Sequence, residues 1–283
     1  MPLPPETTLA DIDWNLLWQN ARKQKSWSSK GPADWDKKAD SFAGRNAGSA
    51  YVSLLLARLA LTPDLTVLDV GSGPGTLAIP LAERVRSITA LDYSAGMLAA
   101  LNRQIQASNI QNIRTIQGSW EDDWQQLGIA KHDIAIASRS LAVDDLALAL
   151  RKLNDYATGY VFITDRIAPT PFDPAAFAAI GREFQSGPDY IYTVNILYSM
   201  AIHPSIEILE LERDTVFADM EEALQSYVWM FKDLSSREEE ALRGYLNSRV
   251  IPSPPSAGKQ ITIRREHPPQ WALIWWQKDR PLE

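Results

Sequence analysis

The sequence contains no cysteine among its 283 residues. This absence excludes disulfide bonds, zinc–thiolate sites and a thiol nucleophile. No apolar run reaches the roughly 18 residues that a membrane-spanning helix needs. Met1 to Thr8 also lack the charged-then-apolar pattern of a signal peptide, so the cytoplasm is the expected compartment. The three histidines show no spacing with Asp or Glu that predicts a metal site.

The sequence also has no excess of basic over acidic side chains. The chain has 28 basic and 35 acidic side chains, which gives a net charge of -7. Proteins that bind nucleic acid usually carry a basic face, so a nucleic-acid partner is disfavoured and a small-molecule partner is expected. Hydrophobic residues make up 45% of the chain, which is enough for a substantial globular core.

Short apolar runs alternate with amphipathic stretches in the middle of the chain. This pattern predicts a parallel sheet with right-handed helical crossovers, in an α/β fold: a Rossmann-like, mostly parallel sheet flanked by helices. The expected strands are 66–70, 87–91, 113–117, 133–137 and 159–164, and the expected helices between them are 76–85, 94–105 and 146–153.

The segments on either side of this core do not show the same alternation of strands and helices. We interpret residues 1–61 as an N-terminal helical lid or cap, 62–165 as the ligand-binding core, and 166–283 as acceptor-side helices with the final strands of the sheet. In the last segment, helices are expected at 189–201, 219–232 and 235–248 and strands at 206–217 and 271–277, with 261–263 pairing near the last of these.

The core begins with Asp-x-Gly-x-Gly-x-Gly at the end of its first strand, Asp69 to Gly75. A sharp turn from strand to helix needs positive φ at some positions, where a side chain costs about 1–2 kcal/mol. Glycine also lets a ligand approach the backbone, and the following helix is expected to offer free N–H groups.

Two carboxylates indicate which ligand this turn binds. Asp69 suits a ligand with an ammonium group better than a pyrophosphate, and Asp92 ends the next strand, where a carboxylate accepts from both ribose hydroxyls. Gly118 to Glu121 follow the third strand, where an adenine edge would lie. A nicotinamide enzyme would instead show Gly-x-Gly-x-x-Gly. These details favour S-adenosylmethionine.

Residues 35–165 resemble the class I S-adenosylmethionine-dependent methyltransferases of the small-molecule "type 11" style. The resemblance implies S-adenosylmethionine as cofactor and S-adenosylhomocysteine as product. It implies that Asp69 and the glycines line the methionine portion, that Asp92 holds the ribose, and that Ser138, Arg139 and Ser140 lie beside the methyl group. The cofactor-binding residues expected are Trp35, Asp69, Gly71, Ser72, Gly73, Gly75, Thr76, Asp92, Tyr93, Met97, Ser119, Trp120, Ser138 and Arg139.

The chain departs from the family pattern at one position. Many relatives carry an aspartate, where this chain has Ser119, to bond the adenine amino group; Glu121 or Asp122 are candidates to replace it. Residues 35–42 also look like the N-terminal helix that covers the cofactor in such enzymes. Trp35 either stacks near the sulfonium or packs with Phe42 as an ordinary core residue.

The acceptor is expected to contact the elements above the carboxyl edge of the sheet. The candidate substrate-binding residues are Tyr192, Asn195, Tyr198 and Arg166, and the candidate catalytic residues are Asp165 and His203. Asp165 would orient the acceptor, act as a general base, or form an ion pair with the arginine after it. In helix 189–201, residues Ile191, Val194 and Ala201 are expected to face inward.

The predicted function is methyl transfer to a small molecule by in-line displacement. Alignment and desolvation supply most of the catalysis, and a base is needed only if the nucleophile holds its proton. Residues 138–141 lack the Asn/Asp-Pro-Pro-Tyr/Phe run of enzymes that methylate base amines or glutamine amides. The alternatives are a protein or RNA acceptor, a nicotinamide-dependent oxidoreductase, and a non-catalytic module that binds S-adenosylmethionine.

Overall fold

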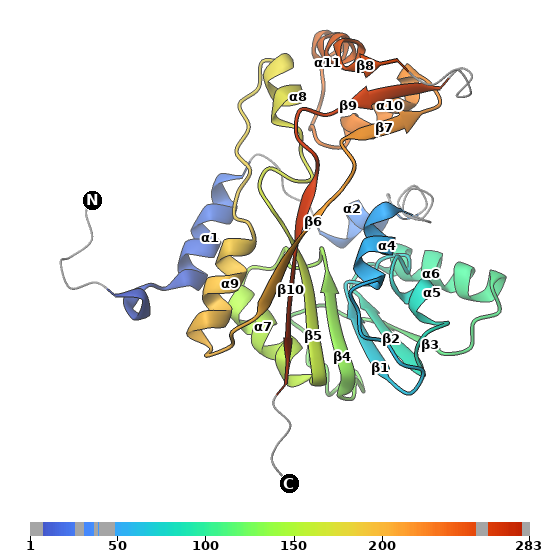
Figure 1. Cartoon of the computed structure of the whole chain (residues 1–283), viewed down its shortest axis with the longest axis vertical. Coiled ribbons are helices and arrows are strands. Elements are labelled where there is room, and N and C mark those ends of the chain that lie inside the picture. The colour runs from blue at the N-terminus through green and yellow to red at the C-terminus, as the bar shows by residue number, and fades with distance from the viewer. Residues whose placement is uncertain (1–7, 26–30, 37–38, 40–48, 253–259, 279–283) are drawn as a thin grey trace.

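A seven-stranded sheet forms the centre of the protein (Figure 1), in a computed structural model that describes residues 8–25, 31–36, 39, 49–252 and 260–278. Its strand order is β3-β2-β1-β4-β5-β10-β6. Strand β10 runs antiparallel to both of its neighbours, and the pairs among the first five strands are parallel. The strands are β1 (Thr66–Val70), β2 (Ser87–Asp92), β3 (Ile113–Gln117), β4 (His132–Ser138), β5 (Ala157–Arg166), β6 (Ser205–Glu210) and β10 (Gln270–Gln277). The predicted mostly parallel sheet flanked by helices is confirmed.

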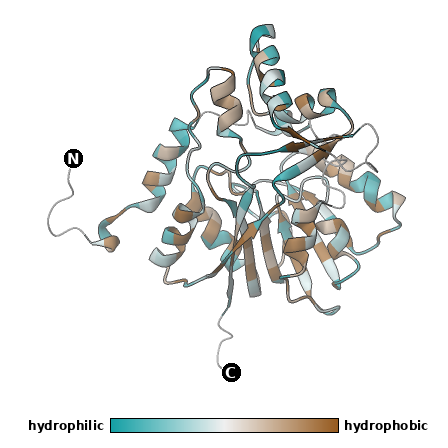
Figure 2. Ribbon diagram, turned by 45° about the horizontal axis from the view of Figure 1, so that its top comes forward, coloured by the Kyte–Doolittle hydropathy of each residue, from teal (hydrophilic) through white to brown (hydrophobic). Residues whose placement is uncertain are grey.

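Helices cover both faces of this sheet because its central strands are apolar on both sides, as Figure 2 shows. One face packs against α1 (Trp14–Gln24), α7 (Leu146–Asp155) and α9 (Tyr190–Ser199). The other packs against α4 (Ala50–Leu56), α5 (Ala78–Leu81) and α6 (Ala95–Ala107). The short helices η1 (Leu9–Asp11) and α2 (Pro32–Asp36) complete the N-terminal part, and α2 lies against α6.

A second, smaller unit has its own sheet and its own buried core. Figure 1 shows it at the top, joined to the large sheet through β6 and β10. It comprises α8 (Pro174–Ala179), β7 (Asp214–Phe217), α10 (Met220–Val228), α11 (Ser236–Ser248), β8 (Val250–Ile251) and β9 (Ile261–Arg264), with strand order β7-β9-β8. Its core contains Phe177, Leu224 and Leu242 and is separate from the cores of the large sheet.

This unit corrects two expectations. Residues 206–217 are not one strand but β6 and β7, which belong to different sheets. The chain leaves the large sheet after Leu211, whose N–H donates to the Pro269 carbonyl at 2.9 Å, and Arg213 then bonds to the Arg265 and Glu266 carbonyls. Strand β9 pairs with β7 and β8 rather than near the C-terminal strand.

Two helix expectations are also wrong. The helix expected over 76–85 is only the four residues of α5. Pro80 has no N–H to donate within a helix, and the residues on either side of α5 form turns. In α9 the buried residues are Thr193, Ile196 and Leu197, whereas Ile191 is 44% exposed and Ala201 lies exposed beyond the helix end. Thr193 faces inward because its hydroxyl donates to the buried Asp165 at 2.7 Å.

Within the described residues, no helix has both the length and the apolar character needed to cross a membrane.

Candidate functional site

The glycine-rich turn after β1 has left-handed backbone at three positions. Gly71, Gly73 and Gly75 have φ of +73°, +56° and +90°. A Cβ on Gly71 would lie 2.3 Å from Ser140 Cβ, and one on Gly75 would lie 2.4 Å from Leu101. A Cβ on Gly73 would meet no atom of the described residues within 4 Å. Two of the glycines therefore permit close packing, and Gly73 leaves space that a ligand can fill.

The amides of this turn are used differently from the expectation. Gly71 and Ser72 both donate to the Leu91 carbonyl, at 2.7 and 3.0 Å, and Gly73 donates to Asp92 Oδ2 at 2.8 Å. Helix α5 begins at Ala78, so the expectation of free N–H groups at the helix start concerns the amides after Gly75 and stays a prediction. The turn is thus held by β2, and the amides of Gly71, Ser72 and Gly73 already have acceptors within the protein.

Three buried side-chain oxygens lack a hydrogen-bond partner among the described residues, and all three lie on this turn or directly beside it. They are Asp69 Oδ2, Ser72 Oγ and Thr76 Oγ1. Leaving such groups unpaired costs about 1–3 kcal/mol each. Burial, followed by the neighbouring charge of Asp92, raises the pKa of Asp69 to about 7. The site is therefore built for a ligand that supplies polar groups, and an ammonium suits the carboxylate of Asp69.

Asp92 links the turn to the start of α6. It is 6% exposed, and its two oxygens accept from Gly73 N and from Ser94 N, each at 2.8 Å. Burial raises its pKa, and the amide bonds oppose that shift. Because a carboxylate has about four acceptor positions, Asp92 can still accept from ribose hydroxyls.

The loop after β3 forms the end of the site where adenine is expected. Ser119 N and Oγ both donate to Asp122 Oδ2, at 2.7 and 3.1 Å, so Asp122 fixes this loop. Trp120 Nε1 donates to the Ser140 carbonyl at 3.1 Å. Of the two carboxylates considered as replacements for the family aspartate, Glu121 lines the cavity and Asp122 does not.

Helix α2 closes one side of the site. Asp36 Oδ1 accepts from Ser94 Oγ at 2.6 Å and from Gly96 N at 2.9 Å, which joins α2 to the first turn of α6. A Cβ on Gly96 would lie 2.8 Å from Asp36 Cα, so this close approach requires glycine. Trp35 packs with Ala39, Met97 and Ala100. Phe42, the other aromatic of the expected lid, lies outside the described residues.

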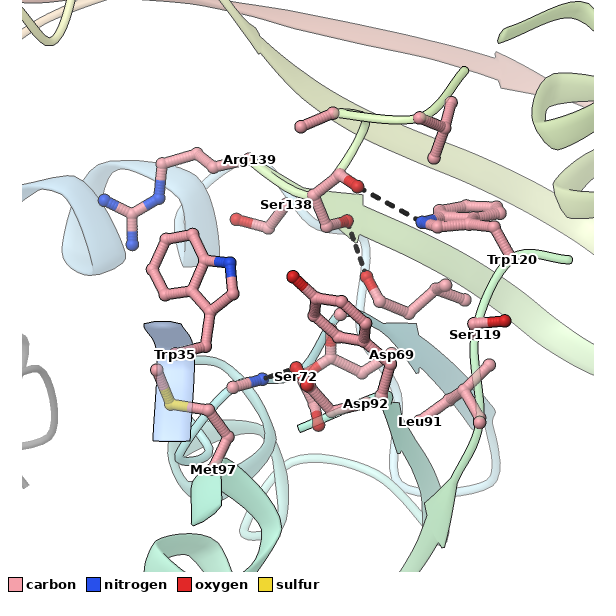
Figure 3. Close-up of a pocket in the computed structure, with 18 of the residues that line it drawn as sticks. Trp35, Asp69, Ser72, Leu91, Asp92, Met97, Ser119, Trp120, Ser138 and Arg139 are labelled. Atoms are coloured by element: carbon pink, nitrogen blue, oxygen red, sulfur yellow. Dashed lines mark hydrogen bonds between the residues drawn. The ribbon is translucent and has the colours of Figure 1, made fainter. Parts of the chain in front are cut away.

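These elements surround one cavity of about 290 Å³. Every predicted cofactor residue except Gly75 lines it, and Figure 3 shows Trp35, Asp69, Asp92, Ser119 and Arg139 around it. Gly75 instead packs against Leu101 and Ile79. The sequence therefore identifies most of the cavity wall.

The predicted acceptor and catalytic residues do not line this cavity. Asp165 accepts from Thr193 and from Arg166 N, and the Arg166 side chain donates to the Ser186 and Pro188 carbonyls. Of the remaining candidates, Asn195 Nδ2 donates to the Ile191 carbonyl of its own helix, Tyr192 lies edge-on to Trp18, and Tyr198 lies edge-on to His203.

Several lining residues were not expected from the sequence. Arg22 reaches the cavity from α1 and pairs with Asp144 at 3.1 Å, and Ala142 and Val143 complete that side. The position of Arg22 depends on tertiary packing, since Trp18 Nε1 donates to the Val143 carbonyl at 2.9 Å. No local signal reveals it. Leu91 also lines the cavity, and its place directly before Asp92 is a signal that sequence reasoning can use.

Comparisons with known proteins agree with this geometry. A family model described as a methyltransferase domain matches residues 67–159. An uncharacterized protein of Haemophilus influenzae is 34% identical over 276 residues, which cover 96% of this chain and 99% of that protein. A probable cobalt-precorrin-6B C(15)-methyltransferase (decarboxylating) of Methanocaldococcus jannaschii is 25% identical over 146 residues, covering 52% of this chain and 73% of that protein.

A solved structure shares the fold. A putative methyltransferase from Bacillus halodurans superimposes with a TM-score of 0.56 at 14% identity, covering 83% of this chain and all of that one.

Proposed function

Because the chain belongs to the class I S-adenosylmethionine-dependent methyltransferases, we propose that it transfers the methyl group to a small-molecule acceptor. The observation that carries this proposal is the concave site between α1, α2 and the loop after β4. Walls from α1, α2 and the loop after β4 surround a space of about 290 Å³, near the lower end of the range of small-molecule pockets. The net charge of -7 also disfavours RNA. The Methanocaldococcus relative is a probable cobalt-precorrin-6B methyltransferase, and cobalt-precorrin-6B is a small molecule.

The cavity residues fit the cofactor. Asp69 offers a carboxylate to its ammonium, and Ser72 and Thr76 offer buried hydroxyls that have no partner among the residues that the structure describes. Asp92 has acceptor positions left for the ribose hydroxyls. Ser119, Trp120 and Leu91 line the end assigned to adenine. We infer that the unpaired groups gain their partners when the cofactor binds.

When bound, S-adenosylmethionine supplies a methyl group on a positively charged sulfur. The protein's contribution is to hold that group in line with the acceptor and to exclude water. Trp35 and Met97 cover the cavity from the side of α2 and α6. The reaction then needs a base only for an acceptor that keeps its proton at the working pH.

This proposal predicts where a labelled methyl group goes. We expect the purified protein, given methyl-labelled S-adenosylmethionine and a fractionated cell extract, to transfer label into the low-molecular-weight fraction. The measurement is scintillation counting of the small-molecule, protein and RNA fractions, with the Gly73→Val variant as the inactive control. Label only in the protein or RNA fraction would contradict a small acceptor. Cofactor binding without transfer into any fraction would indicate a non-catalytic module.

Asp92→Ala is expected to weaken binding of S-adenosylhomocysteine by about 1–3 kcal/mol, the loss of hydrogen bonds to a charged group. Removing the carboxylate also frees the Gly73 and Ser94 amides that it holds. Titration calorimetry measures the effect. Asp133→Ala is the matched control, since Asp133 accepts from Thr66 N and Oγ1 at the start of β1. The control should lose stability and keep its affinity; equal affinity in the Asp92 variant would remove Asp92 from the site.

A further inference from the structure

Two basic side chains at the end of helix α1 lie at or next to the cavity, although the chain as a whole is acidic. Arg22 lines the cavity, and its side chain is 18% exposed. Lys25 follows three residues later at the helix end, so the two side chains are neighbours. Lys23, in the same turn, is exposed. Because the net charge is -7, a group of buried cations here does not follow from the composition.

A third cation reaches Lys25 from the carboxyl end of β5. Arg166 Nε donates to the Pro188 carbonyl at 2.7 Å, and Nη2 donates to the Ser186 carbonyl, so the loop before α9 fixes this guanidinium. Gly187, with φ of +71°, lies between the two basic side chains. A Cβ there would lie 2.6 Å from Lys25 Cβ and 3.3 Å from both Lys25 Cδ and Arg166 Nη2. The glycine therefore lets the lysine and the arginine approach each other.

The charge of Lys25 is poorly balanced by its neighbours. Burial, followed by the charges of Arg22 and Arg166, lowers the pKa of Lys25 to about 8. Asp144 opposes this shift, but its side chain is 95% exposed and already pairs with Arg22 at 3.1 Å. Like charges held together in a partly buried place disfavour the charged state unless an anion joins them.

The carboxylates near Arg166 serve other groups. Asp165 accepts from the Arg166 amide at 2.8 Å, and Asp189 accepts from the Ile191 amide at 3.2 Å, at the start of α9. Both act on the pKa of Arg166, and neither is among the charges that shift the pKa of Lys25. An anion supplied by a ligand would therefore gain interactions that the described residues leave unused.

These cations lie at the edge of the sheet where the acceptor is expected. Arg166 ends β5, which runs parallel to β4, so its carboxyl end shares an edge with the strand ends that form the donor site. Arg22 lines the cavity beside the loop after β4, through its contacts with Val143 and Asp144. A cation pair in this place can hold one end of an acceptor and so align another of its atoms with the methyl group.

We propose that the small-molecule acceptor carries an anionic group, a carboxylate or a phosphate, that binds to Lys25 and Arg22 beside Arg166. A different atom of the acceptor receives the methyl group, so the product keeps this negative charge. The inference rests on the proposed function, since it names the chemical class of the small-molecule acceptor.

The charge of the methylated product tests the inference. The labelled low-molecular-weight fraction of the transfer reaction is passed over an anion-exchange resin at neutral pH, and we expect the product to be retained, whereas cationic S-adenosylmethionine passes through. Phosphatase treatment of the retained product then distinguishes the two anions that the inference allows. Lys25→Gln should raise the extract concentration needed for half-maximal transfer about tenfold, because a charge-assisted contact is lost. Titration calorimetry should show unchanged affinity for S-adenosylhomocysteine.

Lys23→Gln is the matched control, because it removes an exposed cation from the same helix turn and should behave like the unaltered protein. Labelled product that passes through the resin, or a Lys25 variant that transfers label as the Lys23 variant does, overturns the inference.

No label in any small molecule would instead contradict the proposed function. In that case, binding of tricarballylate, a small tricarboxylate, to the protein saturated with S-adenosylhomocysteine decides whether the anion site exists. Weakening by about fivefold or more in Lys25→Gln, with no change in Lys23→Gln, supports the site. Absent binding, or equal binding in both variants, overturns it.

Discussion

Gly73→Val is expected to abolish detectable binding of S-adenosylmethionine while the protein stays folded. A Cβ at this position meets no atom within 4 Å in the part of the chain that the structure describes, so the methyl groups of valine would occupy the cavity that Gly73 lines. We expect an affinity loss of about 100-fold or more, equivalent to about 2.7 kcal/mol or more. The left-handed φ of +56° adds a folding cost of about 1–2 kcal/mol. Calorimetry with S-adenosylhomocysteine and circular dichroism measure the two effects separately.

Gly181→Val is the matched control for this substitution. Gly181 has φ of +77°, and a Cβ there would also meet no described atom within 4 Å, but Gly181 does not line the cavity. The control should therefore lose a similar amount of stability and keep its affinity for S-adenosylhomocysteine. Unchanged affinity in the Gly73 variant, or the same loss in both variants, would contradict the assignment of this turn.

Asp69→Asn is expected to weaken cofactor binding and, at the same time, to stabilise the ligand-free protein at pH 8. The carboxylate is 1% exposed, and burial raises its pKa from 3.8 to about 7. At pH 8 the folded protein must hold this charge in a buried site, at a cost of about 1.4 kcal/mol for each unit of pKa shift. The neutral amide removes that cost. A rise in Tm of at least about 2 °C at pH 8 is expected.

The pH dependence gives the sign of the effect. Between the unfolded pKa of 3.8 and the folded pKa of about 7, the folded protein binds more protons at Asp69 than the unfolded chain does. The contribution of Asp69 to stability therefore falls as the pH rises through this window. Thermal unfolding at pH 4 should show no gain for the variant, in contrast to pH 8. Cofactor affinity should increase with pH through about 7 in the unaltered protein and stay flat in the variant. Parallel pH profiles in the two proteins would rule out this role.

The parts of the fold that the sequence predicts are those set by local pattern. The alternation of apolar strands and amphipathic helices predicts the parallel sheet. The sheet in turn predicts much of the cavity wall, because strand-end residues such as Asp69, Asp92 and Ser138 meet at one edge. The glycine spacing identified the turn. Each of these inferences depends only on residues that are close together in the sequence.

The parts that it does not predict depend on contacts between distant segments. Nothing near residue 212 signals that the chain passes from one sheet to the other there. The hydrogen bonds that fix this change run to the carbonyls of Pro269 and Arg265, more than 50 residues away. Periodicity alone also misplaced the buried face of α9, because the apolar residues almost encircle that helix and the buried Asp165 decides which side faces inward. Asp36 and Arg22 reach the cavity region through docking of α2 and α1, which no local motif encodes.

The distribution of the cavity-lining residues along the chain has an evolutionary consequence. Among the described residues, all of them fall between Arg22 and Asp144, and later residues such as Lys152, Thr164 and Trp271 contact the lining residues without lining the cavity themselves. Substitutions and insertions in the small unit can accumulate with little penalty for recognition of the methyl donor. Descendants of one ancestor can therefore retain a common donor pocket while the remainder of the chain diversifies under separate selection.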